Sequence, residues 1–372
     1  MVVRKCAMLL VVTGLLVGFG MQGSVSAANR VIAWGANSAG QTAAPANLAD
    51  VVAVSGGAYH SLALRSDGTV VAWGDNTFGQ TNVPPSATNI TTIAAGWFHN
   101  LALTADHTVI AWGDNTYGQS ADSGLSSVIA IATGWLHNLA LKTDGTVAAW
   151  GDNGWGQASV PANFTDVAAI AAGELHSLAL RSNGTVIAWG DNTYGQTNVP
   201  AELNNVAAIA CGWLHSLALQ SNGTIVAWGD NFSGQTNAPA DLTNAVTLAA
   251  GAAHSLSSRN GSPLTAWGNN YFSQTNVPTV WTNIVAVAAG GYHSLAIVPA
   301  SLLVLNSGQP GGAGFQFQVA GSFGNGPVVV YATTNLKDWT PIFTNPPTVG
   351  TIPVLDASAT NALRKFYRAQ EN

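Results

Sequence analysis

The tripeptide Ala-Trp-Gly recurs through most of this 372-residue chain, and its spacing constrains the fold more than any other feature. Successive copies are separated by 39, 39, 38, 39, 39 and 39 residues, at Trp34, Trp73, Trp112, Trp150, Trp189, Trp228 and Trp267. A second marker, Gly-x-x-His, follows the same period at His60, His99, His137, His176, His215, His254 and His293. Such periods indicate a solenoid, a propeller or an array, in which neighbouring units bury one another's apolar surface.

Each of the first six His residues precedes a Trp by 13 positions, and the residues between them predict a β-hairpin. The first copy reads His60–Leu64, then a turn containing Asp67-Gly68, then Thr69–Trp73. Asp-Gly and Asn-Gly pairs tolerate positive φ and favour tight hairpin turns. Both faces of these strands carry apolar or small residues, which indicates strands covered on both sides.

Two further strands per repeat are expected, one before the His and one after the Trp. Thr92–Ala95 represents the first, and Gly79–Pro84 represents the second, where Pro suits an outer edge that needs no ladder donor. Four short strands per repeat are typical of a propeller blade.

The two ends of the array are complementary halves. Val31–Gly35 lacks a preceding His strand, and Gly290–Ile297 lacks a following Trp strand. Pairing the two halves would close a ring of seven blades and remove its exposed edges. We therefore predict an all-β, seven-bladed β-propeller over residues 28–299, closed by its N- and C-terminal strands. Its least regular blade should lie around residues 254–278, where Leu256-Ser257-Ser258 replaces Leu-Ala-Leu.

The first 27 residues resemble a signal peptide. Arg4 and Lys5 precede an apolar stretch from Ala7 to Gly20, which is short for a membrane span. Cleavage is expected after Ala27, with Ala28 as the alternative site and an uncleaved anchor as the competing interpretation. No second long apolar run follows, so no membrane span is expected after removal of the signal.

Residues 300–372 carry no repeat and are expected to form a small, separate β-sandwich-like module. Phe315–Val319 and Val328–Tyr331 have strand-like patterns, Asn335–Trp339 reads as a turn, and Lys365–Arg368 is close to the C-terminus. The segment resembles small all-β modules at the C-termini of exported bacterial proteins, which suggests a role in attachment or spacing.

Composition excludes some functions. Only 8% of residues are charged and the net charge is −6, without a basic cluster beyond the first residues. A nucleic acid partner requires a basic footprint and is therefore not expected. Cys6 would leave with the signal and Cys211 would remain alone as a small buried apolar residue, so the mature chain has no intramolecular disulfide.

The motifs Gly-x-x-His-Ser-Leu-Ala-Leu, Asp-Gly-Thr-Val and Ala-Trp-Gly-Asp-Asn-x-x-Gly-Gln resemble the regulator of chromosome condensation repeat family. The resemblance extends from Val31 to about Val298. Within the family, Gly-Gln-Thr-Asn-Val-Pro is most similar to bacterial secreted members such as the type II β-lactamase inhibitory protein. The resemblance implies a seven-bladed propeller that docks other proteins with one face; it does not imply nucleotide exchange.

The sequence shows no catalytic, metal or cofactor signature. Because the seven His residues occupy one equivalent position, we interpret them as structural, bonded to the neighbouring blade's backbone. The repeated Gly-Asp-Asn suggests Asx-turns before it suggests calcium. No Gly-x-Ser-x-Gly, His-Glu-x-x-His or phosphate loop occurs, so we expect no enzyme activity and no cofactor.

Aromatic residues concentrate in two loops of the repeat. Because the two hairpin strands are antiparallel, the Gly-x-x-His loop and the Asp-Asn loop should share one end of each blade. Aromatic side chains dominate protein interfaces. The predicted partner-binding residues are therefore Tyr59, Phe78, Trp97, Phe98, Tyr117, Trp135, Trp155, Tyr194, Trp213, Phe232, Tyr271 and Tyr292.

These observations favour a non-enzymatic protein-binding propeller that is secreted, periplasmic or held at the cell surface, and monomeric. Aromatic platforms beside Asn and Asp also suit sugars, so a carbohydrate-binding module is the alternative. An inhibitor of a secreted hydrolase such as a β-lactamase, and an enzyme with its site in the central channel, are weaker hypotheses.

Overall fold

The computed structural model describes residues 10–13, 29–46, 48–162, 164–259, 263–278, 284–299, 304–311, 314–323, 328–333, 340–345, 349–356 and 364–371. The chain divides into two compact units, Asn29–Val298 and the combination of Met1–Ala28 with Pro299–Asn372. Strands are the only regular elements in the described ranges, as expected for the all-β class. Those ranges contain no helix that is long and apolar enough to cross a membrane.

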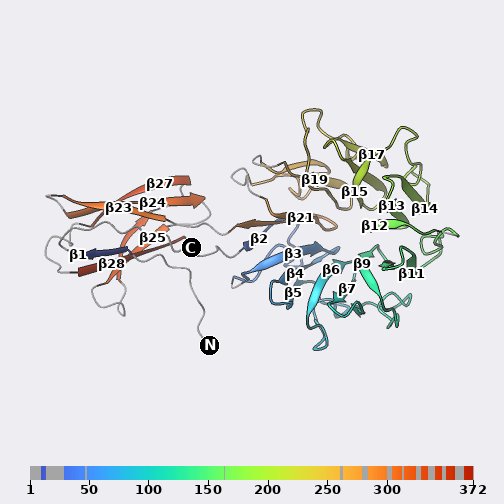
Figure 1. Ribbon diagram of the computed structural model, residues 1–372, viewed down its shortest axis with the longest axis horizontal. Coiled ribbons are helices and arrows are strands. Elements are labelled where there is room, and N and C mark those ends of the chain that lie inside the picture. Colours follow the sequence, from blue (N-terminus) through green and yellow to red (C-terminus); the bar gives the residue numbers. More distant parts are fainter. Residues whose placement is uncertain are drawn as a thin grey trace. The chain divides into compact units, whose positions relative to one another are not determined.

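Within the described part of Asn29–Val298 there are seven three-stranded sheets (Figure 1). The inner strands precede the Gly-x-x-His loops: β3 (Val51–Gly56), β6 (Ile90–Ala95), β9 (Val128–Thr133), β12 (Val167–Ala172), β15 (Val206–Cys211), β18 (Ala249–Ala250) and β21 (Ala286–Ala289). The middle strands begin with the repeated His: β4 (His60–Arg65), β7 (His99–Thr104), β10 (His137–Lys142), β13 (His176–Arg181), β16 (His215–Gln220), β19 (His254–Ser257) and β22 (His293–Pro299). The outer strands end with Trp-Gly: β2 (Asn29–Gly35), β5 (Val70–Gly74), β8 (Val109–Gly113), β11 (Val147–Gly151), β14 (Val186–Gly190), β17 (Ile225–Gly229) and β20 (Thr265–Gly268).

The hydrophobic core consists of layers between neighbouring sheets. In β4, Leu62 and Ala63 are adjacent and both have no exposed surface. Leu62 packs with Ile93 and Trp112 of the next sheet, whereas Ala63 faces the layer shared with Leu295 of the last sheet. The middle strands are thus covered on both faces, which explains their lack of polar alternation.

The N-terminal strand β2 belongs to the same sheet as β22 and β21, so this sheet joins both ends of the repeat array. The Ala36 amide donates to the Tyr292 carbonyl at 2.9 Å, and the Trp34 indole donates to the Gln274 carbonyl at 2.9 Å. Val31 and Ala33 pack against the layer between the first and last sheets. This is the pairing that the two incomplete repeats predicted.

The prediction of a fourth strand after each Trp was wrong, because Gly79–Pro84 and its counterparts consist of a turn followed by irregular backbone. Side chains satisfy the backbone there in place of a strand ladder. The Gln80 Oε1 atom accepts from the Phe78 amide at 2.8 Å, and the Asn82 amide donates to the Gly79 carbonyl at 3.0 Å. Gly79 has a φ of 77°, which is the left-handed region and interrupts an extended chain.

The sheet formed by β18, β19 and β20 has shorter strands than most, as the sequence predicted for residues 254–278. Ser257 stands where other copies have Ala, and its hydroxyl donates to the Thr247 carbonyl at 2.8 Å. Ser258 and Thr247 also share a side-chain hydrogen bond of 2.7 Å. These local bonds compete with regular strand pairing.

The described residues of the second unit form two sheets. One has the order β23-β24-β27 and the other β1-β28-β25-β26. Their strands are β1 (Leu10–Thr13), β23 (Val304–Gly311), β24 (Gly314–Phe323), β25 (Val328–Thr333), β26 (Thr340–Asn345), β27 (Val349–Asp356) and β28 (Arg364–Glu371). Of the predicted signal peptide only Leu10–Thr13 is described, so its cleavage stays a prediction. The predicted turn at Asn335–Trp339 lies outside the described residues.

Candidate functional site

The Gly-x-x-His loops and the Asp-Asn loops lie together at one end of each sheet. In the first sheet the Asp75 amide donates to the Tyr59 carbonyl at 2.9 Å, which ties the two loops directly. The same bond joins Asp114 to Phe98 and Asp191 to Leu175. The antiparallel hairpin therefore places both predicted aromatic sets at this end, which we call the loop face.

The Asp-Asn loops are built by Asx-turns. The Asp75 carboxylate accepts from the Thr77 amide and hydroxyl with one oxygen and from the Gln80 side chain with the other. Both oxygens are thus used within the loop, which supports the interpretation of Gly-Asp-Asn as turn chemistry. Within this loop the aromatic side chain, Phe78 in the first copy, is exposed at the surface.

The structure places six of the predicted partner-binding residues in these turns. We call them the outer ring: Phe78, Tyr117, Trp155, Tyr194, Phe232 and Tyr271. Their exposed fractions range from 46% for Phe78 to 95% for Phe232. Each lies in a hydrogen-bonded Asp-Asn loop. The rings occupy two adjacent positions of the repeat, because Phe232 and Tyr271 stand one residue earlier in the loop than the other four.

The other predicted residues lie in the Gly-x-x-His loops and contact one another. We call them the mouth cluster: Tyr59, Trp97, Phe98, Trp135, Trp213 and Tyr292. Trp97 stacks on Trp135 with ring centroids 4.2 Å apart and on Trp213 at 4.6 Å. Tyr292 meets Trp213 edge-on at 5.3 Å. These rings are only partly exposed because they cover each other, an arrangement that one-dimensional spacing did not predict.

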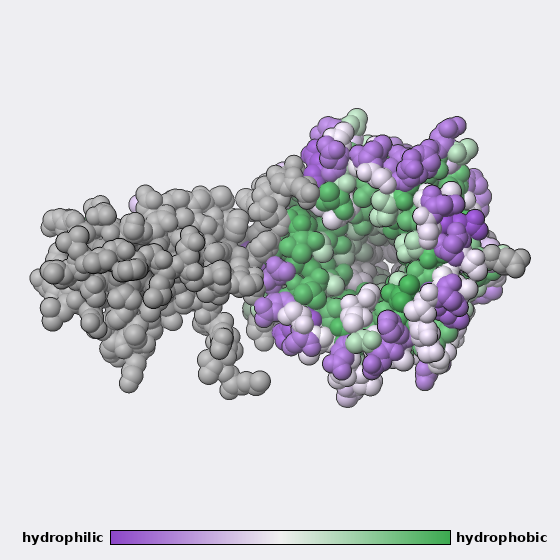
Figure 2. Space-filling model, in the orientation of Figure 1, coloured by the Kyte–Doolittle hydropathy of each residue, from purple (hydrophilic) through white to green (hydrophobic). Residues whose placement is uncertain are grey.

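A central cavity of about 100 Å³ opens among the inner strands and their loops. Its lining includes the three stacked Trp residues, backbone of the repeated Gly, Cys211 and Glu174. In the face shown in Figure 2, apolar residues surround a central hollow of this unit and polar residues occupy its periphery. Glu174 is an isolated carboxylate in the sequence, and its place at the cavity is evident only in the tertiary structure.

The seven repeated His residues form a closed series of side-chain contacts between sheets. His60 contacts Asn100 of the next sheet at 2.7 Å, and His293 of the last sheet contacts Ser61 of the first at 2.9 Å. The remaining five pairs are His99–Asn138, His137–Ser177, His176–Ser216, His215–Ser255 and His254–Ser294. The structural interpretation of His is supported, but these bonds reach a side chain and not the predicted backbone group.

The hydrogen-bond pattern assigns the His tautomer. The Ser61 hydroxyl donates to the Gln41 carbonyl, so it accepts from the His293 Nε2–H. Asn100 likewise donates to the Gln80 carbonyl and accepts at its side-chain oxygen. The repeated Trp donates to the same Gln carbonyl, as Trp73 does to Gln41 at 2.9 Å. The repeat motif is therefore one inter-sheet hydrogen-bond network.

Burial keeps these imidazoles neutral. All seven have no exposed surface, and their Nδ1 atoms have no hydrogen-bond partner in the described residues. Burial lowers the pKa of His60, His99, His176 and His254 to about 4. It lowers the pKa of His137, His215 and His293 to about 3. Low-dielectric surroundings disfavour the charged imidazolium.

The Gly of each Gly-x-x-His motif is required by the His ring packed against it. A Cβ on Gly134 would lie 2.3 Å from the His137 ring and 2.4 Å from the Gly173 carbonyl oxygen. Neither neighbour can retreat, because one is a buried ring and the other is backbone. The Gly therefore lets adjacent sheets approach closely around the cavity.

We expect Gly134→Ala to destabilise the protein by roughly 3 kcal/mol or more, through overpacking of a buried site. Urea unfolding followed by Trp fluorescence measures the change. Gly154→Ala is the matched control, because a Cβ there meets no atom closer than 3.6 Å. Equal stability of the two variants would contradict this account of the Gly.

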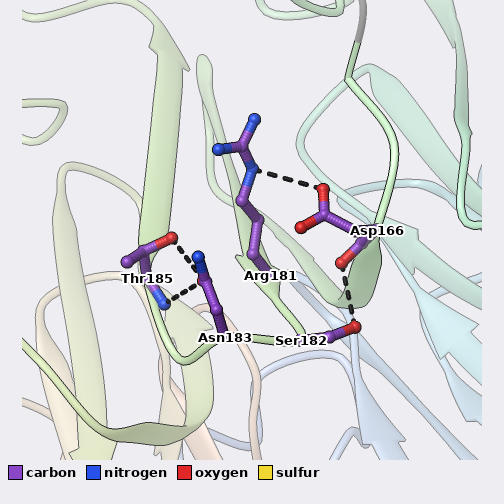
Figure 3. Close-up of polar contacts among 5 residues, drawn as sticks. All are labelled: Asp166, Arg181, Ser182, Asn183 and Thr185. Atoms are coloured by element: carbon purple, nitrogen blue, oxygen red, sulfur yellow. Dashed lines mark hydrogen bonds and ion pairs between the residues drawn. The ribbon is translucent and has the colours of Figure 1, made fainter.

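The opposite end of the unit consists of hairpin turns with local polar contacts. Figure 3 shows Asn183 accepting from the Thr185 amide at 3.1 Å and from its hydroxyl at 2.7 Å. Arg181 forms an ion pair of 3.5 Å with Asp166, and the Ser182 hydroxyl donates to the Asp166 carbonyl. The sequence Asn183-Gly184-Thr185 thus forms a turn in which the Asn side chain bonds the Thr two residues later.

A succession of similar sheets around a central cavity, each contributing an inner strand, defines this unit as a β-propeller. Five copies of its motif match the Regulator of chromosome condensation (RCC1) repeat, at residues 51–80, 90–119, 128–157, 167–196 and 206–235. The chain therefore carries RCC1 repeats. No curated protein sequence matches the chain.

Solved structures support the propeller fold. Prp20p from Saccharomyces cerevisiae has 20% sequence identity and a TM-score of 0.63, covering 74% of this chain and 92% of its own. Human WBSCR16 has 18% identity and a TM-score of 0.61, and the match covers 73% of this chain and 99% of WBSCR16. The ectodomain of the Physcomitrella patens receptor kinase CR4 has 19% identity and a TM-score of 0.56, with 70% and 76% covered. At these identities the similarity concerns the fold alone.

Proposed function

We propose that the protein is an exported, non-enzymatic propeller that binds another protein with its loop face. The observation that carries this proposal is the outer ring, six exposed aromatic side chains in the Asp-Asn loops of successive sheets. Scattered exposed rings are ordinary, but a continuous set at one end of a molecule requires a reason. Aromatic side chains supply large contact area at low entropy cost and dominate protein interfaces.

Proteins of similar fold have protein partners. Prp20p is described with binding properties to Gsp1p and histones, and yeast RCC1 has been solved bound to Kap60. These partners belong to those proteins. For this chain, the signal-peptide pattern favours a partner outside the cytoplasm, and a secreted hydrolase such as a β-lactamase is one candidate class.

A protein partner fits this face better than a glycan does. Polar groups beside an aromatic platform would contact a sugar, and part of this hydrogen-bonding capacity is already used within the Asp-Asn loops. The side-chain amide of Asn76 donates to the side-chain oxygen of Asn82 at 3.0 Å, and that of Asn192 donates to the side-chain oxygen of Asn198 at 2.8 Å. A low charge content and a net charge of −6 also disfavour nucleic acid.

We expect Phe232→Ala and Trp155→Ala each to weaken partner binding by roughly 1–4 kcal/mol, as hot-spot aromatic residues do. Their melting temperatures should hardly change, because both rings are more than half exposed. The measurement is affinity capture on the purified protein from extracellular fractions, followed by calorimetric titration of the captured protein against each variant.

Ile129→Ala is the matched control for this experiment. Ile129 is an apolar side chain that is 46% exposed, and it lies at the start of β9, at the hairpin-turn end of the sheet. Its removal should leave partner affinity unchanged. Partner binding that survives both aromatic substitutions but is lost in Ile129→Ala would place the docking face at the turn end. Saturable binding on a glycan array without any protein partner would favour the carbohydrate alternative.

A further inference from the structure

Glu174 occupies an exceptional position among the Gly-x-x-His loops. The equivalent position is Ala, Gly or Trp in the other six copies. The Glu174 amide donates to the Trp213 carbonyl at 3.1 Å, and the Trp135 amide donates to the Gly173 carbonyl at 3.3 Å. Glu174 therefore stands between the loops of Trp135 and Trp213, and it is the only charged residue in the described lining of the cavity.

The carboxyl group of Glu174 lacks a cationic counterpart in the described residues. The ion pair identified in the described residues joins Arg181 to Asp166, at the hairpin-turn end and away from Glu174. The groups that influence Glu174 are Asp191 and the Tyr292 phenol, which lies near Tyr59, and none of them is cationic. Burial, with Asp191 as a smaller cause, raises the pKa of Glu174 to about 7. A cation entering the cavity would relieve this unfavourable environment.

The mouth cluster also contains an unused donor. The indole N–H of Trp97 is buried and has no hydrogen-bond acceptor in the part of the chain that the structure describes. A finished hydrophobic core rarely leaves such a donor unpaired. An acceptor would reach this N–H only after the neighbouring rings had shifted, so the polar groups of the mouth cluster are not fully satisfied as they stand.

We propose that the mouth cluster and Glu174 bind the side-chain ammonium of a lysine residue presented by the partner protein. Aromatic faces attract ammonium groups through the ring quadrupole, and Trp is the most effective ring for this interaction. The carboxylate supplies the charge complement in the lining of the cavity. The cavity of about 100 Å³ suits the compact end of a lysine side chain. This inference rests on the proposed protein-binding function and identifies the group that the partner inserts.

The test is a titration of the purified protein at pH 8, where Glu174 is mostly ionised, followed by indole N–H signals in NMR spectra. The probe is Nα-acetyl-lysine methylamide, and the matched neutral probe is Nα-acetyl-norleucine methylamide, which lacks the ammonium. We expect the lysine probe to bind at least tenfold more tightly than the norleucine probe. Glu174→Gln should lower lysine affinity at least tenfold, whereas Glu202→Gln, which changes an exposed carboxylate elsewhere, should not.

Equal affinity for the two probes, or unchanged lysine affinity in Glu174→Gln, would overturn the inference. Tighter binding of the corresponding arginine amide would also overturn it, because the group recognised would then be a guanidinium. A captured partner that is sensitive to Phe232→Ala but not to Glu174→Gln would leave the proposed function standing without this lysine site. Lysine binding in a protein that captures no partner would overturn the protein source of the ammonium.

Discussion

Acidification from pH 7 to pH 5 is expected to remove most of the conformational stability of the propeller unit. Its seven buried His residues have a pKa of about 3 or 4 in the folded state, as in His137 and His176. The ordinary value in an unfolded chain is about 6.5. Between these values the unfolded chain binds more protons than the folded one, so protons favour unfolding.

Proton binding determines both the direction and the magnitude of this change in stability with pH. Stability is fully present above about pH 6.5 and is lost progressively as the pH falls toward the folded-state values. At pH 5 each His lowers the free energy of unfolding by roughly 2 kcal/mol, and the seven together lower it by on the order of 10 kcal/mol. This is comparable with the whole stability of an ordinary domain, about 5–15 kcal/mol. We therefore expect an acid transition near pH 5.

Other titrating groups do not produce the same effect. The raised pKa of Glu174 acts in the opposite direction, because the folded state takes up that proton first, but it is a single group. Hydrogen bonds from Thr69 and Thr146 lower the pKa of Asp67 and Asp144, which affects stability only at more acidic pH. The window between pH 6.5 and pH 4.5 therefore reports mainly on His.

Urea unfolding at a series of pH values measures this dependence. His176→Gln should reduce the slope of stability against pH by about one proton, in addition to lowering stability at pH 7. Ile129→Ala is the control, because it changes an exposed side chain that carries no titratable group, and its slope should match the parent. A stability that changes by less than about 2 kcal/mol between pH 7 and pH 5 would contradict the assignment of seven neutral buried imidazoles.

Deletion of residues 28–40 is expected to destabilise the whole propeller unit. The deletion removes β2, the Trp34 bond to Gln274 and the Ala36 bond to Tyr292. It also uncovers Leu295 and Ile297, which have no exposed surface in the intact chain. Exposure of several such side chains costs about 1.5–3 kcal/mol each, so a total loss of roughly 5 kcal/mol or more is expected.

The loss should be global because the sheets form a mutually supporting series. In differential scanning calorimetry the propeller unit should still unfold in a single transition, with a melting temperature lowered by more than about 10 °C. Deletion of residues 300–372 is the control: it removes a longer segment that belongs to the other compact unit. A β2 deletion that melts like the parent would show that the ring does not depend on joining its two ends.

Much of the fold was readable from the sequence because its evidence is local and repeated. The spacing of Trp, the Asp-Gly and Asn-Gly turns and the alternation of the hairpin each recur several times, so one irregular copy could not obscure them. The incomplete copies around Trp34 and His293 predicted the sheet that joins the two ends of the repeat array. The broken motif at Leu256-Ser257-Ser258 likewise predicted the short strands of that sheet.

The fourth strand was predicted wrongly because its residues serve a different set of bonds. Gly79–Pro84 has the composition of an edge strand, but Asn76 and Gln80 draw its backbone into turns. Side-chain competition of this kind depends on where the preceding strand ends and cannot be judged from propensity alone.

The sequence alone was sufficient for the repeat, the hairpins and the shared end of the aromatic loops, because each depends on neighbours along the chain. The structural character of the His residues followed from their equivalent position in every copy, but their partners were decided between sheets. The contacts among different repeats were decided by the tertiary structure. Trp97, Trp135 and Trp213 are far apart in sequence, yet they stack because the ring of sheets brings their loops to one axis. The same convergence places Glu174, which occupies the equivalent position of a fourth repeat, at the cavity. Identical positions in the repeat thus acquire different surroundings, since burial depends on which side chains meet across the ring.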